Sequence, residues 1–188
     1  MNISRTEAET ALSDIEQAAA AVCVQRSYRV AAPILILWGV IWVFGYAGMG
    51  ILTGAHWSLL WIPLDLIGIV GTLFVVRRSR GGASARRTRA QSGFSPWHAL
   101  AILLMLVGTF VMFGPSQPAA YIAYPGLLCG FSYMMFGIMR MPRLAWIGAA
   151  MGALTLLGFF LAKDILSYWM AVVGGGGLIL GGLWLRKL

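Results

Sequence analysis

The chain has 188 residues, of which 60% are hydrophobic and only 11% are charged, and its mean hydropathy is +0.81. A water-soluble domain carries roughly 25% charged residues, so this composition excludes such a domain and predicts an integral membrane protein. The formal net charge of +8 does not indicate nucleic-acid binding, because the basic residues lie between apolar stretches rather than on one folded face.

Residues 1–25 are predicted to form a cytoplasmic amphipathic helix that precedes the membrane bundle. Thr6 and Glu9 fit a capping box at its start. Its apolar residues are spaced four and three apart, as on one seam of a helix: Ala8, Leu12, Ile15, Ala19 and Val22. Its acidic residues make it poorly suited to an anionic membrane surface: Glu7, Glu9, Asp14 and Glu16. We expect either a helix that lies against the bundle and its basic loop, or a docking helix in which residues 6–24 bind a cytoplasmic protein or a second copy.

Residues 26–188 are predicted to form a bundle of six transmembrane helices, each about 20 apolar residues long. The spans are roughly 31–52, 57–76, 97–114, 119–139, 143–162 and 165–185. The alternating pattern of a membrane β-barrel does not occur in the sequence, so the spans must be helical. The predicted fold class is therefore an all-α membrane protein. The N-terminus lacks the pattern of a secretory signal, and we expect it to be retained.

A weak internal repeat groups the six spans into pairs. The odd spans have a proline at or near their start, and the even spans end in arginine: Pro33, Pro96 and Pro142, then Arg77, Arg140 and Arg186. This pattern predicts three consecutive helical hairpins. Prolines at helix starts also arise for purely local reasons, so six independently started helices are the alternative.

The basic residues predict the orientation of the chain in its membrane. Of the 14 Lys and Arg residues, all but Lys163 fall in the N-terminal segment, the second and fourth loops or the C-terminus. Cytoplasmic loops carry the excess of positive charge. We therefore expect a multi-pass protein of the bacterial inner (cytoplasmic) membrane with both termini in the cytoplasm.

The longest predicted loop, residues 77–96, is basic and rich in Gly and Ser. Its arginines are Arg77, Arg78, Arg80, Arg86, Arg87 and Arg89. A flexible linker is one interpretation. Contact with anionic lipid headgroups or with a protein partner is the other, because an arginine near the bilayer surface is worth about 1 kcal/mol.

Asp65 lies about eight residues into the second span, in the stretch WIPLDLIG, and so near the middle of the bilayer. A carboxylate there costs about 2.5–3.5 kcal/mol on insertion scales, so we expect it to be protonated much of the time and to face the bundle. Three polar neighbours share its helix face: Ser58, Trp61 and Thr72. The residue is either a hydrogen-bonded staple between helices or a proton or cation site.

Other spans carry aromatic and glycine patterns. Trp38, Trp42 and Tyr46 follow one stripe of the first span, which predicts helix packing or a pocket for an apolar or cationic ligand. Three GxxxG pairs predict close helix packing: Gly126 and Gly130, Gly148 and Gly152, and Gly177 and Gly181. The run of four glycines at 174–177 favours either close packing of the fifth and sixth spans or local unwinding of the kind that builds transporter sites.

No enzyme motif is found, and we expect no catalytic residues, no metal site and no cofactor. His56 and His98 fall at opposite membrane faces in this topology, so they cannot share one metal ion. The stretch GFSY at 130–133 lacks the second glycine and the histidine of an intramembrane serine protease. The sequence also lacks the HExxH motif of metalloproteases.

The stretch SYRVAAPILILWGVIWVFGY, residues 27–46, resembles the opening of small, poorly characterised bacterial six-span membrane proteins, some of which are associated with transcriptional regulators. The resemblance covers about a tenth of the chain and depends on a proline, a WGxxW and further aromatics. It implies a non-enzymatic accessory or regulatory protein that acts through its cytoplasmic surface. The alternative from Asp65 is a small proton- or cation-coupled transporter or channel.

Overall fold

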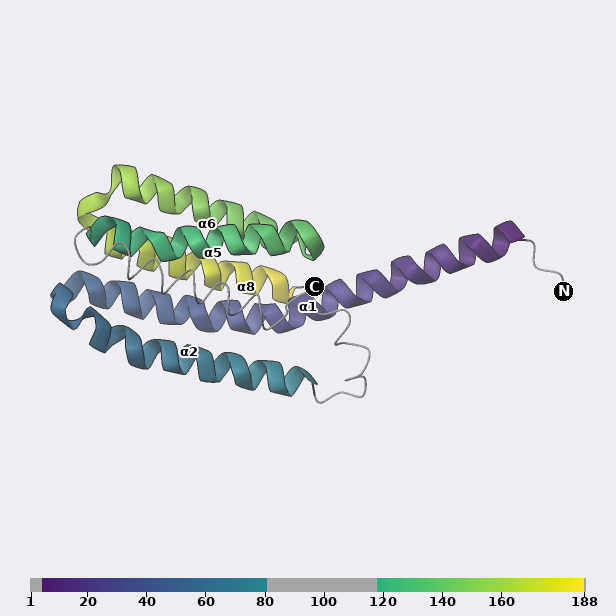
Figure 1. Ribbon diagram of the computed structural model, residues 1–188, viewed down its shortest axis with the longest axis horizontal. Helices are drawn as coiled ribbons and strands as arrows, with labels where there is room; N and C mark the ends of the chain where they lie inside the picture. The colour runs from purple at the N-terminus through teal and green to yellow at the C-terminus, as the bar shows by residue number, and fades with distance from the viewer. Residues whose placement is uncertain (1–4, 81–117, 188) are drawn as a thin grey trace.

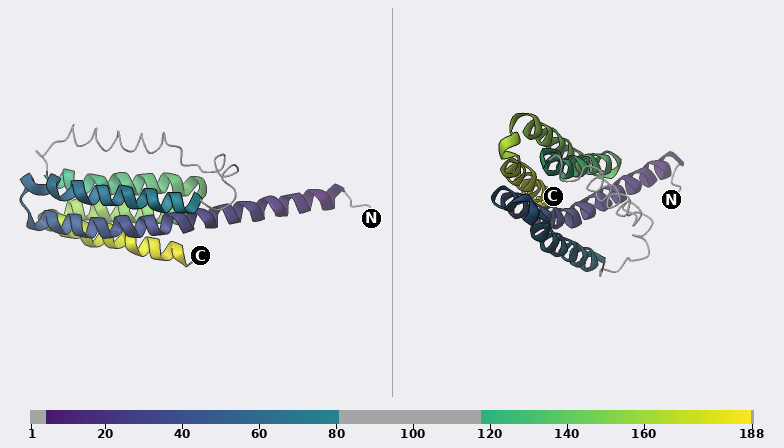
Figure 2. Two further views of the ribbon diagram at one scale, coloured as in Figure 1. Left: turned by 90° about the horizontal axis from the view of Figure 1, so that it is seen from below. Right: turned by 60° about the vertical axis from the view of Figure 1, so that its left-hand side comes forward.

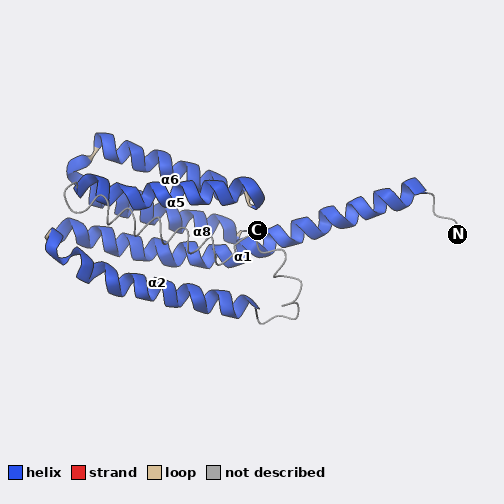
Figure 3. Cartoon of the chain, in the orientation of Figure 1, coloured by secondary structure: helices blue, strands red, loops and turns tan. Residues whose placement is uncertain are grey.

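The computed structural model describes residues 5–80 and 118–187, and every regular element in these two ranges is a helix (Figure 3). Five of these helices are long and apolar enough to cross a membrane. The described part of the chain is therefore all-helical, and its composition suits a bilayer. The predicted third span, 97–114, lies outside the described residues, as do residues 81–96 of the basic loop.

The first element, α1 (Arg5–Ile51), is one helix of 47 residues, about 70 Å long at 1.5 Å per residue. It passes through residues 25 and 26 without a break, so the sequence-based division at that point is not a structural boundary. The alanine-rich stretch 18–21 explains the continuity, because alanine has the highest helix propensity. The first predicted span and the segment before it are thus one rigid element.

The N-terminal half of α1 does not lie against the rest of the described structure. Every side chain from Thr6 to Val22 is exposed, and the helix extends past the ends of its neighbours (Figure 1; Figure 2, left). The expectation of a helix packed on the bundle is therefore wrong for the described residues. The direction of the helix is set by its continuity with the first span.

A short turn, η1 (Gly54–His56), connects α1 to α2 (Trp57–Arg80), which returns beside it. Glycines let the two helices approach. A Cβ on Gly68 would lie 2.8 Å from the Trp38 ring, and one on Gly45 would lie 2.6 Å from the Trp61 ring. The opposite face of α2 exposes large apolar side chains, as expected of a lipid-facing surface: Leu59, Ile62, Leu66, Ile67, Val70 and Phe74.

The most extensive interface joins α5 (Pro118–Arg140) and α6 (Pro142–Leu161). Their backbones touch where glycines face one another. A Cβ on Gly130 would lie 2.9 Å from the Gly148 carbonyl oxygen, and a Cβ on Gly148 would contact the backbone of Gly130 in return. Gly137 approaches the backbone of Ala145 in the same way. Small residues bring these two helices together, as they do in other membrane proteins.

The last span is a composite of four helical pieces: η3 (Lys163–Ile165), α7 (Leu166–Trp169), the π-helix η4 (Met170–Gly175) and α8 (Gly176–Arg186). Its main partner is α1, where a Cβ on Gly175 would lie 2.7 Å from the Val43 backbone nitrogen. Gly174 and Gly175 thus lie in the widened part of the helix and pack against the first span rather than the fifth, whereas a Cβ on Gly176 or Gly177 would meet nothing within 4 Å.

The described helices pack into one bundle, and the arrangement as three consecutive hairpins stays a prediction, because the predicted third span lies outside the described residues. α6 adjoins the last span across a short turn, yet its larger interface is with α5, and α8 packs chiefly on α1. The core lies where α1, α5, α6 and the last span meet, with α1 at its centre. Tyr46 and Leu178 are among its fully buried side chains. α2 is peripheral and contacts the described bundle mainly through α1.

Candidate functional site

Asp65 is half-buried on the side of α2 that faces α1. Its neighbours along this face, Trp61 and Thr72, bond to other groups. The Trp61 indole nitrogen lies 3.0 Å from the Met49 sulfur, to which it donates. Thr72 Oγ1 accepts a hydrogen bond of 3.0 Å from Trp38 Nε1. Ser58, the remaining predicted member of the group, is exposed. Trp61 and Thr72 therefore bond α2 to α1, and these two bonds do not involve the Asp65 carboxyl group.

The carboxyl group of Asp65 forms no hydrogen bond with any residue in the described part of the chain. Two tyrosine hydroxyls, those of Tyr46 and Tyr121, are close enough for electrostatic interaction with it. The Tyr46 hydroxyl donates to the Ile122 carbonyl at 3.1 Å instead. Asp65 thus interacts electrostatically with a tyrosine on α1 and with one near the start of α5.

The aromatic side chains around Asp65 pack against one another. Tyr46 lies between Trp42 and Trp61, with ring centroids 5.4 and 5.2 Å away and both contacts edge-to-face. Trp42 and Tyr46 are only 6% and 2% exposed. Their faces are covered by other side chains, so the predicted aromatic pocket is a packed part of the core at these two rings. Trp38, at the other end of the stripe, bonds to Thr72 as described above.

Sequence reasoning missed two polar residues of the bundle. Tyr121 stacks on Trp57 at a centroid distance of 6.0 Å, which joins α5 to α2. Thr155 is 1% exposed, and its hydroxyl has no hydrogen-bond partner among the described residues. It lies beside Gly126 and Met170, next to the π-helix. No signal along the chain relates these residues, because they meet only through the packing of separate helices.

Most of the described basic residues of the bundle lie at the end where α2 and α8 finish and α6 begins, and Lys163 is an exception. Arg26 donates to the Ser79 carbonyl at 3.3 Å. The Arg143 guanidinium lies 5.2 Å from the Trp184 ring centroid, and its backbone N–H donates to the Tyr28 hydroxyl at 3.3 Å. Arg77 and Arg78 are exposed at the same end. The side chain of Arg80 is not described, and Arg86, Arg87 and Arg89 lie outside the described residues.

The opposite end of the bundle is nearly neutral. It carries Lys163 and Asp164, both exposed, and the exposed His56, whose Nδ1 lies 2.9 Å from Thr53 Oγ1. Within residues 5–80 and 118–187, no cluster of three or more His, Cys, Asp or Glu side chains could hold a metal ion. The two ends therefore differ in charge, and the projecting half of α1 lies at the basic end.

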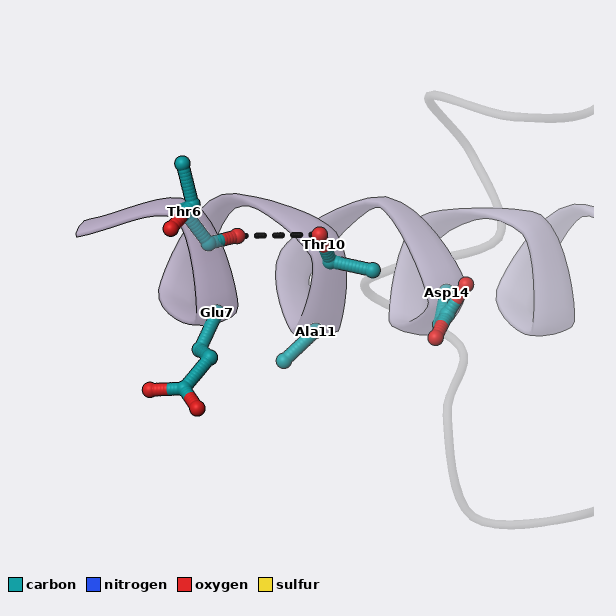
Figure 4. Close-up of a pocket in the computed structure, with 5 residues that line it drawn as sticks. All are labelled: Thr6, Glu7, Thr10, Ala11 and Asp14. Carbon is teal, nitrogen blue, oxygen red and sulfur yellow. Dashed lines mark hydrogen bonds between the residues drawn. The ribbon is translucent and has the colours of Figure 1, made fainter. Parts of the chain in front are cut away.

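The projecting half of α1 carries four of the six acidic residues in the whole chain, namely Glu7, Glu9, Asp14 and Glu16. A shallow surface hollow here is lined by Thr6, Glu7, Thr10, Ala11 and Asp14 (Figure 4). All five belong to one helix, and the Thr10 hydroxyl donates to the Thr6 carbonyl at 2.9 Å. A single helix cannot enclose a ligand, so this hollow is an open surface rather than a small-molecule pocket.

Comparisons of the chain with protein-family models, curated proteins and solved structures found no match. The functional argument therefore depends on the geometry of two regions: the projecting acidic half of α1 and the junction around Asp65.

Proposed function

We propose that this chain is a non-enzymatic accessory or regulatory protein of the bacterial inner membrane that acts through its cytoplasmic surface. One observation carries the proposal. The acidic half of α1 projects from the basic end of the bundle, and its side chains from Thr6 to Val22 are all exposed. A membrane protein that only transported a solute would have no evident use for an acidic arm of this length.

The charge distribution supports the cytoplasmic placement of this arm. Arg26, Arg77, Arg78 and Arg143 all lie at the end of the bundle from which the arm projects. Positive residues favour the cytoplasmic side of a membrane. An anionic membrane surface repels Glu and Asp side chains, so it would not hold the arm flat. The arm is therefore available to a soluble protein, and its acids would steer a basic surface toward it.

Photocrosslinking in living cells tests the proposal. A photoreactive amino acid at Ser13, which is exposed on the arm, would report what touches it. We expect discrete crosslinks to cytoplasmic proteins that disappear when the arm's acids are replaced: Glu7→Gln, Glu9→Gln, Asp14→Asn and Glu16→Gln. Asp164→Asn, which neutralises an exposed acid at the other end, is the matched control and should keep them. Crosslinks that survive neutralisation, or none in the wild type, would contradict the proposal.

A second candidate function is a small proton- or cation-coupled transporter or channel. The observation that favours it is the half-buried carboxyl of Asp65, which is near Tyr46 and Tyr121 but forms no hydrogen bond to a described residue. A structural acid in a membrane is normally bonded. A half-buried carboxyl group in a membrane span can exchange a proton or a cation, as intramembrane acids on ion pathways do, and phenol hydroxyls are suitable neighbours for either.

A further inference from the structure

The projecting half of α1 has an exposed apolar seam between two columns of acids. Leu12, Ile15 and Val22 are 60%, 65% and 65% exposed, and Ala8 and Ala19 complete the seam at heptad spacing. Leu12 and Ala19 are equivalent to heptad position a, and Ala8, Ile15 and Val22 to position d. The seam ends before Arg26, which bonds to the Ser79 carbonyl of α2. It therefore covers only the part of the helix that leaves the bundle.

We propose that this seam binds the same seam of a second copy of the chain, so that two copies form a parallel helix pair above the membrane. The inference deepens the proposed function and rests on it, because it names what covers the apolar face of the arm and leaves the acids outward for the cytoplasmic partner.

The direction of the arm favours a second copy. α1 is one unbroken helix, and its part next to the bundle is fixed by the buried Tyr28 and by the bond from Arg26 to Ser79. Two copies inserted in the same membrane with the same orientation present identical arms that rise on the same side. A parallel pair in register then needs no bending of either arm, whereas an antiparallel pair cannot form.

The charges of the arm permit this pairing. Parallel two-helix coiled coils place residues at position e opposite residues at position g of the partner. Glu9 and Glu16 occupy e, but Ala11 and Ala18 occupy g. A residue at g faces the residue at e that lies five positions later in the second copy, so Ala11 faces Glu16 and no two acids are paired between Ala11 and Cys23. Glu7 and Asp14 occupy c, on the outer part of the pair. The alanines beside the seam also let the two backbones approach closely.

The seam is short, but confinement of both copies to one membrane favours their pairing. It extends over residues 8–22, which is fewer than the three to four heptads that identify a coiled coil from sequence. An isolated peptide of this length is marginal as a helix in water. Here the bundle already continues the helix, and confinement of both copies to one membrane raises their effective concentration. The inference therefore concerns the full chain in its membrane.

Cysteine crosslinking in native membranes tests the pairing. Cys23→Ser and Cys129→Ala remove the natural thiols, and a single cysteine is then placed at Ile15, in the seam, or at Gln17, on the opposite side of the same exposed helix. We expect mild oxidation to give a covalent dimer with Ile15→Cys and little with Gln17→Cys. Equal yields at the two positions would indicate random collision and overturn the proposal. A crosslink from Ile15→Cys to a different protein would overturn it too.

A second measurement uses the purified full-length protein in detergent, where light scattering gives the mass of the protein component. We expect a dimer that Ile15→Asp weakens about tenfold or more, since a buried isoleucine is lost from each copy. Gln17→Asp adds the same charge outside the seam and should leave the dimer intact. A monomer in the wild type, or the same dimer in both variants, would reject the seam. Acid-dependent crosslinks from Ser13 would persist in that case, so the two proposals fail separately.

Discussion

The indole nitrogen of Trp38 donates a hydrogen bond to the hydroxyl of Thr72, 3.0 Å away, and joins α1 to α2 two helical turns beyond Asp65. From its sequence context, Thr72 was a candidate partner for the Asp65 carboxyl group. The structure assigns it to a tryptophan on the neighbouring helix instead. The polar residues of α2 therefore have separate roles. Thr72 and Trp61 bond to α1, and Asp65 interacts electrostatically with Tyr46 and Tyr121.

Replacement of Thr72 by valine is expected to weaken the packing of α2. The substitution keeps the shape of the side chain but removes the acceptor of the Trp38 N–H group. Interhelical hydrogen bonds in membranes average about 0.6 kcal/mol, and the free energy of unfolding in detergent should fall by about that amount. Thr72→Ser, which keeps the hydroxyl, should retain most of it. An unchanged unfolding free energy in Thr72→Val would show that the bond contributes nothing.

The ends of α2 and α5 were predictable to within a few residues, because apolar length and flanking arginines are local properties. The predicted spans 57–76 and 119–139 compare with α2 at Trp57–Arg80 and α5 at Pro118–Arg140. The pairing of helices was less predictable. One interpretation of the glycine run was close packing against the fifth span, yet a Cβ on Gly175 would contact Val43 on the first. Which helix a glycine approaches depends on how all the spans pack, and periodicity within one span does not encode that.

The candidate site was also predictable only in part: the positions of its residues along α2 followed from the sequence, and their partners did not. The spacing of Trp61, Asp65 and Thr72 puts them on one face of α2, where Trp61 and Thr72 bond to α1, because helical geometry is local. Their partners were not predictable. Met49, Trp38 and Tyr121 belong to other helices, and only the packing brings them near. The unbroken length of α1 was missed for a related reason: a division by polarity at residue 25 does not require a division of the helix.

Two glycines on α6 should respond differently to the same substitution. A Cβ on Gly148 would contact the backbone of α5, whereas a Cβ on Gly152 would meet nothing within 4 Å. Gly148→Ala is therefore expected to separate the helices and lower the unfolding free energy by about 1–3 kcal/mol, as overpacking does. Gly152→Ala should be neutral or stabilising by up to about 1 kcal/mol, since alanine is the better helix former. Equal effects in a detergent unfolding assay would contradict the close approach.

The proposed topology predicts the outcome of reporter fusions. Fusions at Ala83 and Leu188 should give a cytoplasmic signal, and a fusion at Gly54, in the turn between α1 and α2, should give a periplasmic one. The physical reason is the excess of arginine at the end of the bundle where α2 and α8 finish. A cytoplasmic signal at Gly54 or a periplasmic one at Ala83 would reverse the orientation and place the acidic arm outside the cell.

Substitutions of Asp65 separate the two candidate functions. Its carboxyl group has no hydrogen bond to a described residue, so neither Asp65→Asn nor Asp65→Leu removes such a bond. Asp65→Asn should therefore keep the wild-type stability in detergent. Asp65→Leu should gain on the order of 1 kcal/mol, because a polar group at this depth is costly. If the chain is an accessory protein, both variants also keep the acid-dependent crosslinks from Ser13.

The transporter predicts a different result for the same variants in proteoliposomes with an imposed pH gradient. Wild-type protein would then carry a proton or cation flux, and Asp65→Asn would abolish it, because an amide cannot release a proton or bind a cation as a carboxylate does. Asp65→Glu, which keeps the acid, should preserve part of the flux. Flux that vanishes in a stable Asp65→Asn protein would favour transport over the accessory role. No flux in the wild type would remove Asp65 as a coupling site and leave the projecting half of α1 as the functional surface.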